Sequence, residues 1–283
     1  MKVFLTGGSG YIGRATIAEL VRQGHAVEAL ARSEQSAEAV TSAGATAVRG
    51  DLRDLDVLNH AAARADAVIH LAQASTEEED LAASTAMQDG VGAGTYVHTS
   101  GSWVYGNTDG VQDETAPWNP PGLVTWRKSV EDAVLARAGA GGRPVILQPG
   151  LLYGGDNRLI DVFFIQPGKQ RGAIPYLGDG SAHWSLIHID DLAPLYVAAL
   201  NAAAGSVYLG VGGVNPTAKE VAEALAHGAG LKTTSITLDQ ARTEMGPIAD
   251  AFALDQQLTP AKAQRELGWE PRHTDRLAVF ART

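Results

Sequence analysis

A glycine-rich turn near the amino terminus has the residue types and the spacing needed to bind phosphate. The segment TGGSGYIG places Gly7, Gly10 and Gly13 in the pattern G-x-x-G-x-x-G, between an apolar run and the start of a helical pattern. Gly7 permits a tight turn, Gly10 lets the backbone approach a pyrophosphate, and Gly13 lets the helix pack closely on the strand. The free N–H groups and the positive dipole end of that helix would then face the phosphates. The turn, with Tyr11 and Ile12, therefore predicts a dinucleotide site.

The residues after the second apolar run indicate which dinucleotide is bound. NAD sites usually have an acidic side chain there, which bonds the 2′-hydroxyl of the adenosine ribose. The segment EALARSEQ has Arg32 and Ser33 instead, and Arg14 follows the last glycine of the turn. A guanidinium matches a 2′-phosphate bidentately, and a serine adds a hydroxyl donor. The sequence therefore favours NADP (NADPH) over NAD; the alternative is that both arginines are solvated surface residues.

Later apolar runs supply the other contacts predicted for the cofactor. The residues after the third run would flank the adenine ring, and those ending the fourth would pass beside the pyrophosphate and ribose. The residues predicted in this way are Asp51, Leu52, His70, Leu71, Ala72, Thr99, Pro149 and Gly150.

The elements that must position these residues alternate along the chain. Short runs rich in Val, Ile and Leu are each followed by a longer amphipathic segment. This pattern is typical of an α/β protein with a Rossmann-type doubly wound parallel sheet. The alternation of apolar runs and amphipathic segments changes after residue 150. This change predicts a dinucleotide-binding domain over 1–150, with 185–202 returning to it. Residues 151–184 and 203–283 are expected to form a smaller C-terminal α/β substrate lobe.

Composition excludes several classes of function. Lys plus Arg total 22 against 32 for Asp plus Glu, the formal net charge is −10, and no basic run is present, which argues against nucleic acid. The absence of cysteine excludes disulfides and thiolate chemistry. We expect a soluble cytoplasmic protein, because no apolar run is long enough to cross a membrane. No metal site is predicted, since Asp190 and Asp191 are explained as caps of the helix that follows.

Taken together, these motifs resemble the extended short-chain dehydrogenase/reductase superfamily, which contains nucleotide-sugar epimerases and dehydratases. The matching pieces, in family order across nearly the whole chain, are TGGSGYIG, GDLRD, VIHLA, HTSGSWVYG, QPGLLYG, GDG and IHIDDLA. The resemblance implies a Ser or Thr that holds the substrate oxygen, a Tyr that acts as acid and base, and a Lys that binds the ribose. It also implies a homodimer formed through two central helices.

Two of those three residues are missing where the resemblance places them. Gly101 occupies the Ser/Thr position, so Ser100 or Ser102 would serve only after a shift of the turn. In the segment LVTWRKSVEDAVL, Arg127 as the ribose-binding residue puts Leu123 at the Tyr position. With Lys128 in that role, Val124 stands there.

Another group must therefore supply the proton, because a general acid has to reach the oxygen that it protonates. Tyr105 in WVYG is the first candidate and Tyr153 in LLYGG the second. In the relatives that the resemblance implies, the residue at Tyr105 is mostly structural or a wall of the pocket. His98 is expected to be a core histidine.

The predicted substrate pocket is apolar. Relatives that act on nucleotide sugars often read GDGxxxR, whereas this chain reads GDGSAHW, so Trp184 replaces the Arg that grips the diphosphate. Trp103, Trp126 and Tyr153 are also expected at the cleft, and the loop at 106–122 has the composition of a lid. The alternative for each indole is packing between lobes or at a dimer surface.

Three functions are consistent with this pattern. The first is an atypical NADP-dependent oxidoreductase that reduces a small molecule with a bulky apolar ketone, enone or imine. The second is a non-redox NADP-binding sensor or regulator, which the missing Ser/Thr and Tyr would suit. The third is a lyase of the epimerase/dehydratase type, against which Trp184 and Arg32 both argue.

Overall fold

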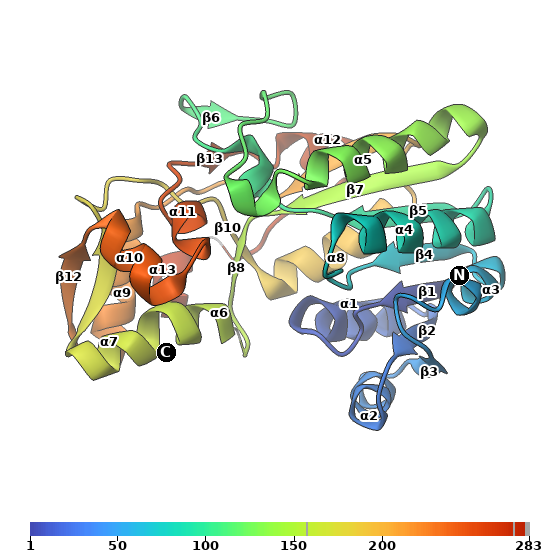
Figure 1. The fold of residues 1–283 in the computed structure, drawn as a ribbon, viewed down its shortest axis with the longest axis horizontal. Helices are drawn as coiled ribbons and strands as arrows, with labels where there is room; N and C mark the ends of the chain where they lie inside the picture. Colours follow the sequence, from blue (N-terminus) through green and yellow to red (C-terminus); the bar gives the residue numbers. More distant parts are fainter. Residues whose placement is uncertain (157, 274, 281–283) are drawn as a thin grey trace.

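A parallel sheet of seven strands forms the main body of the computed structural model, which describes residues 1–156, 158–273 and 275–280. The strand order is β3-β2-β1-β4-β5-β7-β11, and every neighbouring pair is parallel (Figure 1). The strands are β1 (Lys2–Thr6), β2 (Ala26–Ala31), β3 (Thr46–Arg49), β4 (Ala67–His70), β5 (Thr95–Thr99), β7 (Arg143–Pro149) and β11 (Ser206–Gly210). The predicted Rossmann-type α/β fold is confirmed.

Helices cover both faces of this sheet, because successive side chains of a strand point to opposite faces. Along β1, Val3 and Leu5 belong to one core and Phe4 to the other. The first core is closed by α1 (Tyr11–Arg22), α2 (Glu34–Ser42), α8 (Ile189–Ala199) and α12 (Ala261–Leu267). The second is closed by α3 (Leu55–Ala63), α4 (Glu77–Val91) and α5 (Arg127–Ala136), which ends in the 3-10 turn η3 (Arg137–Ala140). Within the described ranges, no helix has the length and apolar character needed to cross a membrane.

A smaller lobe lies beside the carboxyl ends of the strands (Figure 1). In its core, Phe164 packs edge to face on Trp184 and on Phe252, which are tilted against each other, with ring centroids 5.0 to 5.6 Å apart. Its strands are β9 (Ala173–Leu177) and β12 (Lys232–Ile236). Its helical segments are α6 (Arg158–Ile160), the π-helical turn η4 (Asp161–Ile165), α7 (Gln166–Arg171), α9 (Ala218–Ala229), α10 (Leu238–Met245), α11 (Ile248–Phe252) and α13 (Arg276–Phe280).

The boundary between the two parts differs from the predicted one after residue 202. Helix α8 packs on the main core, as expected for the returning segment 185–202. However, β11 is the edge strand of the main sheet and pairs with β7, while α12 and Trp269 pack on the main core. The segment 203–283 therefore divides between the two parts, because SVYLG is an apolar run that completes the sheet.

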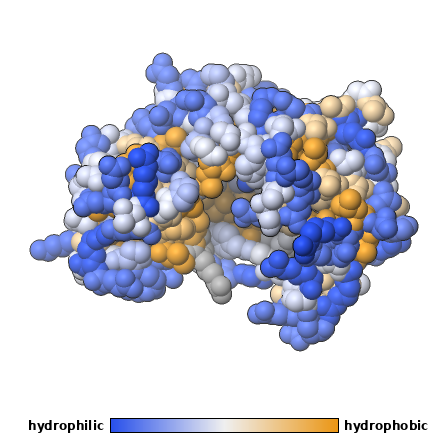
Figure 2. Space-filling model, viewed as in Figure 1, coloured by the Kyte–Doolittle hydropathy of each residue, from blue (hydrophilic) through white to orange (hydrophobic). Residues whose placement is uncertain are grey.

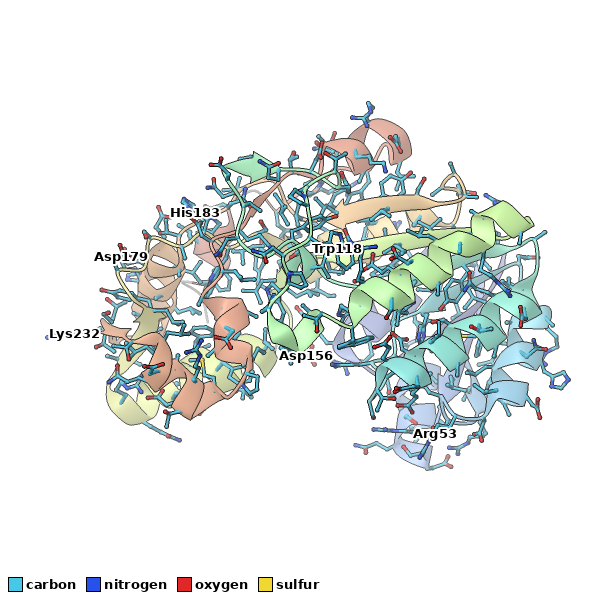
Figure 3. All side chains as sticks on the ribbon, turned by 45° about the horizontal axis from the view of Figure 1, so that its top comes forward. Arg53, Trp118, Asp156, Asp179, His183 and Lys232 are labelled. Atoms are coloured by element: carbon cyan, nitrogen blue, oxygen red, sulfur yellow. The ribbon has the colours of Figure 1, made fainter. Side chains whose placement is uncertain are left out.

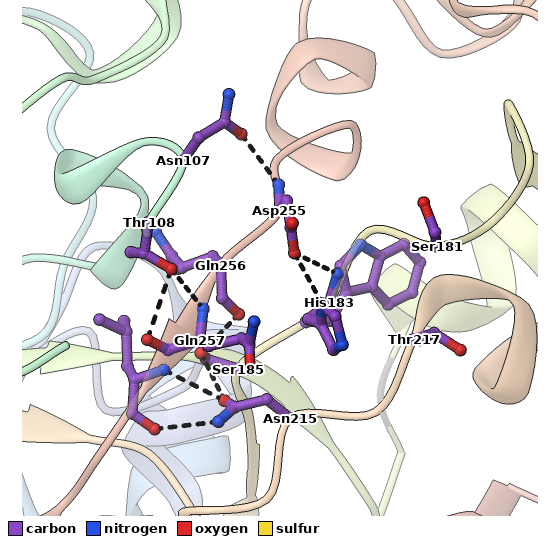
Figure 4. A network of polar contacts seen from close by, with 12 residues as sticks. Asn107, Thr108, Ser181, His183, Ser185, Asn215, Thr217, Asp255, Gln256 and Gln257 are labelled. Carbon is purple, nitrogen blue, oxygen red and sulfur yellow. Dashed lines mark hydrogen bonds and ion pairs between the residues drawn. The ribbon is translucent and has the colours of Figure 1, made fainter. Parts of the chain in front are cut away.

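The loop predicted as a lid is tied down instead. It leaves the 3-10 turn η1 (Ser102–Tyr105), and its strand β6 (Val111–Gln112) pairs with β13 (Gln257–Leu258). Thr108 and Asp255 are joined by a backbone hydrogen bond, Asp255 N–H donates to Asn107, and Gln257 N–H donates to the Thr108 hydroxyl (Figure 4). The second 3-10 turn, η2 (Gly122–Val124), then leads into α5. The loop thus links the main domain to the lobe, and its residues are not among those that line the two cavities described below.

Candidate active site

A groove runs along the carboxyl ends of the strands, where the strand order reverses between β1 and β4 and ligands of such sheets bind. It consists of an outer cavity of about 560 Å³ and an inner cavity of about 430 Å³. Gly10, Tyr11 and Leu159 line both cavities, so the two cavities adjoin. Apolar side chains lie along the depression between the two lobes (Figure 2).

The glycine-rich turn between the two cavities leaves no room for side chains. Gly7 has φ +73°, and a Cβ atom there would lie 2.6 Å from the backbone nitrogen of Ala72. A Cβ atom at Gly13 would lie 2.1 Å from the carbonyl oxygen of Gly7. No side chain caps α1 at Gly10, so its first N–H groups are free to face a ligand. The turn therefore fits a pyrophosphate at the helix N-terminus.

Polar and basic groups line the outer cavity. Arg14, Arg32 and Ser33 all border it, as predicted. The Arg14 guanidinium pairs with Asp156 at 2.5 Å, and Asp156 lies between the two lobes (Figure 3). Arg32 is exposed and forms no ion pair with any residue that the structure describes. Ser33 caps α2, with its hydroxyl accepting from the N–H of Ser36 at 3.2 Å.

The inner cavity brings together residues that are far apart in the sequence. Its apolar wall consists of Ile12, Leu71, Trp103, Pro149, Leu151, Leu152 and Leu159. Its polar lining includes Thr99, Ser100, Ser102 and Arg127, which follow β5 or begin α5. A small apolar molecule and a flat polar ring would both fit such a space.

Of the hydroxyls that line the inner cavity, Ser100 alone lacks a hydrogen-bond partner among the described residues. The Thr99 hydroxyl lies 3.0 Å from that of Tyr196, and the Ser102 hydroxyl donates to Gln256 at 2.9 Å. The Tyr11 hydroxyl donates to the carbonyl oxygen of Gly154, which ties the glycine-rich turn to the loop before α6. The Ser100 Oγ atom is buried and unbonded. Ser100 is also close enough to the Glu131 carboxyl to lower the pKa of that carboxyl.

The structure selects one of the two registers for the start of α5. Arg127 lines the inner cavity, and its buried Nε atom has no partner among the described residues. Lys128 faces solvent, where it pairs with Asp132 and lies 5.6 Å from the ring centroid of Trp118. Arg127 therefore occupies the position of the ribose-binding Lys, and Leu123, which is 42% exposed, stands at the Tyr position.

Opposite charges surround the Arg127 guanidinium. Burial lowers the pKa of Arg127 below its usual value, and the charges of Asp80 and Glu131 oppose that shift. Asp80 is itself fixed by His70, whose Nε2 atom lies 2.9 Å from the carboxylate. A free N–H on a guanidinium held in this way can donate to a ribose hydroxyl.

Glu131 is a site residue that sequence reasoning did not select as functional. It lies one turn beyond Arg127 on α5, is 3% exposed, and accepts a hydrogen bond from Gln148 at 3.0 Å through Oε2. Burial raises the pKa of Glu131 to about 7, although Ser100, Arg127 and Gln148 lower it. The signal was present in the sequence, since residues four apart share one face of a helix.

Comparisons with known proteins identify the family. Residues 3–209 match the NAD dependent epimerase/dehydratase family. The chain belongs to this family. Its members include oxidoreductases, epimerases and dehydratases that use a nicotinamide dinucleotide.

Relatives in this epimerase/dehydratase family differ in activity. A Schizosaccharomyces pombe protein named only as uncharacterized is 29% identical over 99% of this chain and 98% of its own length. The 2-alkyl-3-oxoalkanoate reductase of Stenotrophomonas maltophilia is 29% identical over 72% of this chain and 66% of its own. The dTDP-glucose 4,6-dehydratase DesIV of Streptomyces venezuelae, solved with NAD and TYD bound, has a TM-score of 0.81, 22% identity, and coverage of 100% of this chain and 95% of its own. That last likeness shows the shared fold.

The two tyrosines predicted as proton donors are both in the core. Tyr105 is 1% exposed, and its hydroxyl donates to Gln148 at 2.6 Å. Its ring packs against Trp118 away from both cavities, because η1 turns this side chain inward. Tyr153 is fully buried, and its hydroxyl donates to the carbonyl oxygen of His273 at 3.3 Å. Neither phenol borders the groove of this family member.

Only one of the tryptophans predicted for the substrate pocket lines the inner cavity. That residue is Trp103, whose ring meets Phe252 edge-on at 6.1 Å. The Arg127 guanidinium lies over the ring of Trp126, with its Cζ atom 5.2 Å from the ring centroid, and Trp126 packs on the main core. Trp184 is 6% exposed in the lobe core, where its indole N–H donates to the carbonyl oxygen of Phe252. Trp184 therefore lies outside the lining of the inner cavity and borders a small pocket of about 10 Å³ beside Trp103, because α11 covers this side chain.

Four of the predicted cofactor contacts lie outside the residues that line the groove. Asp51 binds Arg53 at 3.0 Å, and Leu52 packs toward the α3 side of the sheet. His70 points into the core, where it bonds Thr6 at 2.6 Å and Asp80. Ala72 lies behind Gly7. The other predicted cofactor contacts line one or both cavities.

His98 and His188 both have structural positions, one in the core and one at the start of α8. His98 is 2% exposed beside Asp80, and burial lowers its pKa to about 3, which agrees with a core histidine. The cap of α8 is His188, whose Nδ1 atom accepts from the N–H of Asp190 at 3.1 Å. Asp191 instead binds the backbone N–H of His273 at 3.0 Å. The prediction that the two Asp residues cap this helix was therefore wrong.

The register of α5 predicts that the neighbouring residues Arg127 and Lys128 contribute unequally to the affinity for NADPH. Arg127→Ala should raise the Kd for NADPH by about tenfold or more, because a charge-assisted hydrogen bond is lost. Lys128→Ala should leave the Kd within about twofold, since an exposed pair contributes little. Titration calorimetry measures both, and thermal melting checks the fold. A larger effect at Lys128 would overturn the register.

The burial of Tyr105 predicts that its hydroxyl has no part in turnover. Tyr105→Phe should leave kcat within about twofold and lower the free energy of unfolding by about 1 kcal/mol, because Gln148 loses a buried donor. Steady-state kinetics and urea unfolding test the two parts. A loss in kcat of about a hundredfold would restore Tyr105 as the acid.

Proposed function

We propose that this protein is an NADP-dependent reductase of ketones that carry a bulky apolar group. The observation that carries the proposal is the composition of the inner cavity. An unbonded Ser100 hydroxyl and an Arg127 guanidinium meet a wall formed mainly by leucines, Trp103 and Pro149. The polar groups suit a carbonyl and a ribose, and the apolar wall suits the rest of the substrate.

The choice of NADP is supported by the outer cavity. No acidic side chain lies at the end of β2, and Glu34, the first residue of α2, pairs with Arg49. Arg32, Ser33 and Ser36 border the space where α2 begins. A 2′-phosphate there would meet a guanidinium, hydroxyl donors and the positive end of a helix dipole. Arg14 is already engaged by Asp156, so Arg32 is expected to be the main contact.

The chemistry divides between the cofactor and the chain. A bound dihydronicotinamide supplies the hydride. Arg127 holds the ribose from the floor of the groove, and the glycine-rich turn holds the pyrophosphate. Ser100 donates to the substrate oxygen and so polarises the carbonyl for attack. The leucine and tryptophan wall excludes water from the reacting atoms.

A ketone is favoured over a sugar nucleotide as the substrate. Among the described residues that line the inner cavity, Arg127 is the only cationic one, and it lies at the cofactor end. A substrate diphosphate would find no second charged clamp there. The reductase from Stenotrophomonas, by its name, acts on an oxoalkanoate with an alkyl branch, which is a ketone that carries apolar chains and a carboxylate. Homodimer formation through the central helices remains a prediction.

The reductase proposal is tested by NADPH oxidation with a panel of carbonyl compounds. We expect kcat/KM for benzil and for ethyl benzoylacetate to exceed that for acetone by about a hundredfold or more, because the apolar wall binds the larger groups. UDP-glucose should be neither epimerised nor dehydrated. Tight NADPH binding without turnover of any carbonyl would favour the sensor, and turnover of UDP-glucose would favour the epimerase/dehydratase lyase.

The NADP proposal is tested by a charge reversal at the outer cavity. Arg32→Asp should raise the Kd for NADPH by about tenfold or more and leave that for NADH unchanged or lower, since a carboxylate can bond the 2′-hydroxyl. Arg22→Asp, an equal charge change on an exposed arginine at the far end of α1, is the control. Equal affinities of the Arg32 variant and the wild type for NADPH would overturn the assignment.

A further inference from the structure

A polar cluster lies directly behind the wall of the inner cavity. Ser100, Glu131 and Arg127 each have one buried polar atom without a hydrogen-bond partner among the described residues: Oγ, Oε1 and Nε. Ser100 and Arg127 line the cavity, and Glu131 lies behind them on the next turn of α5. Buried polar atoms are nearly always bonded, so these three atoms have bonding capacity left for one another or for a ligand in the cavity.

The carboxyl of Glu131 is held by one oxygen and left open at the other. Gln148, on β7, donates to Oε2 at 3.0 Å, and Tyr105 donates to the oxygen of the same amide at 2.6 Å. The bond from Gln148 holds the Glu131 carboxyl by its Oε2 atom. Ser100 is close enough to lower the pKa of Glu131, while its hydroxyl is not yet aligned as a donor. The open Oε1 atom therefore remains for Ser100.

Several charged and titratable groups from neighbouring elements act on Glu131. Arg127 favours the carboxylate and Asp132 disfavours it, both from α5. Asp80 on α4 acts on Arg127 from the other side, and Tyr105 of η1 is influenced by the charge of Glu131. Burial outweighs the favourable partners and raises the pKa to about 7, so both protonation states are present near neutral pH.

We propose that Glu131 delivers a proton through Ser100 to the substrate oxygen and so replaces the missing tyrosine. The proposal rests on the proposed reductase function. Hydride from the dihydronicotinamide forms the new C–H bond, and the carbonyl π pair moves to oxygen. The Ser100 hydroxyl gives its proton to that oxygen and takes the Oε1 proton of Glu131. The ketone gains two electrons and two hydrogens, and the cofactor loses two electrons.

The neighbours of Glu131 suit this cycle. The carboxylate that remains lies beside the Arg127 guanidinium, which stabilises it without giving up a proton, since Arg stays charged. Water recharges Glu131 once the product alcohol has left the cavity. Ser100 contacts the substrate and is the catalytic residue, whereas Glu131 acts through it and is a relay and positioning residue.

The first test is the pH profile of three proteins. Reduction requires protonated Glu131, so kcat/KM of the wild type with the carbonyl panel should fall as pH rises above about 7. Glu131→Gln keeps the shape and the acceptor for Gln148, and should lower the rate by about a hundredfold and abolish the break near neutral pH. Asp132→Asn, the neighbouring exposed carboxylate, should keep both the rate and the break.

The second test needs neither substrate nor turnover. NMR of protein labelled with ¹³C-glutamate assigns the Glu131 carboxyl as the signal that is absent from Glu131→Gln. This signal should titrate near neutral pH, both in the wild type and in Ser100→Ala. Ser100→Ala should nevertheless lose about a hundredfold in rate. A Glu131 signal that titrates only in the ordinary acidic range would overturn the relay, even with an active enzyme.

The outcomes separate the two proposals. Turnover with an unchanged pH break in Glu131→Gln overturns the relay alone. If none of the carbonyl compounds in the panel supports NADPH oxidation by the wild type, both the reductase function and the relay are overturned. Should Glu131→Gln fail to fold, the wild-type pH profile still decides, because a kcat/KM that does not fall above about pH 7 overturns the relay.

Discussion

The partial burial of one positive charge, that of Arg127 at the inner cavity, determines how the floor of this groove is built. A guanidinium removed from water must be surrounded by opposite charge and hydrogen-bond partners. Asp80 on α4 and Glu131 on α5 supply the charge. Asp80 is held by His70 at the end of β4, and His70 is held by Thr6 at the end of β1. Helices α4 and α5 are therefore tied to the strand ends at the point where the groove opens.

Arg127 stands where the superfamily resemblance implies a Lys, and this replacement limits which group can supply the proton to the substrate oxygen. In the scheme that the superfamily resemblance implies, a Lys lowers the pKa of a Tyr beside it. Here Leu123 stands at the Tyr position, partly exposed, and the guanidinium stays charged over the working pH range. A group with a pKa near neutrality is then needed within reach of the cavity. The buried carboxyl of Glu131 has that property, and Ser100 lies between it and the cavity.

The sequence predicted those parts of the molecule that depend on local geometry. The glycine-rich turn was recognisable because at each glycine of its G-x-x-G-x-x-G pattern a side chain would meet nearby backbone atoms. The strands were recognisable because their apolar runs are short and regular. Tyr105 and Trp184 were misplaced because burial of an aromatic ring depends on elements distant in sequence, here Gln148 and α11. The same cause hid β11, whose partner β7 is far away along the chain. The spacing places Glu131 on the same helix face as Arg127, but the raised pKa of Glu131 depends on desolvation, which the spacing does not show.

The apolar wall of the inner cavity is a fixed surface, and this bears on how selectivity arises. Trp103 presents one face to the cavity and meets Phe252 of the smaller lobe at its edge. The turn that carries Trp103 is bound by Gln256, whose buried amide donates to the carbonyl oxygens of Ser102 and Gly106 at 2.8 and 3.0 Å. A wall anchored by buried hydrogen bonds from both lobes has little freedom to adjust to a ligand. Selection among ketones then depends on the shape of the space between Trp103 and the leucines opposite.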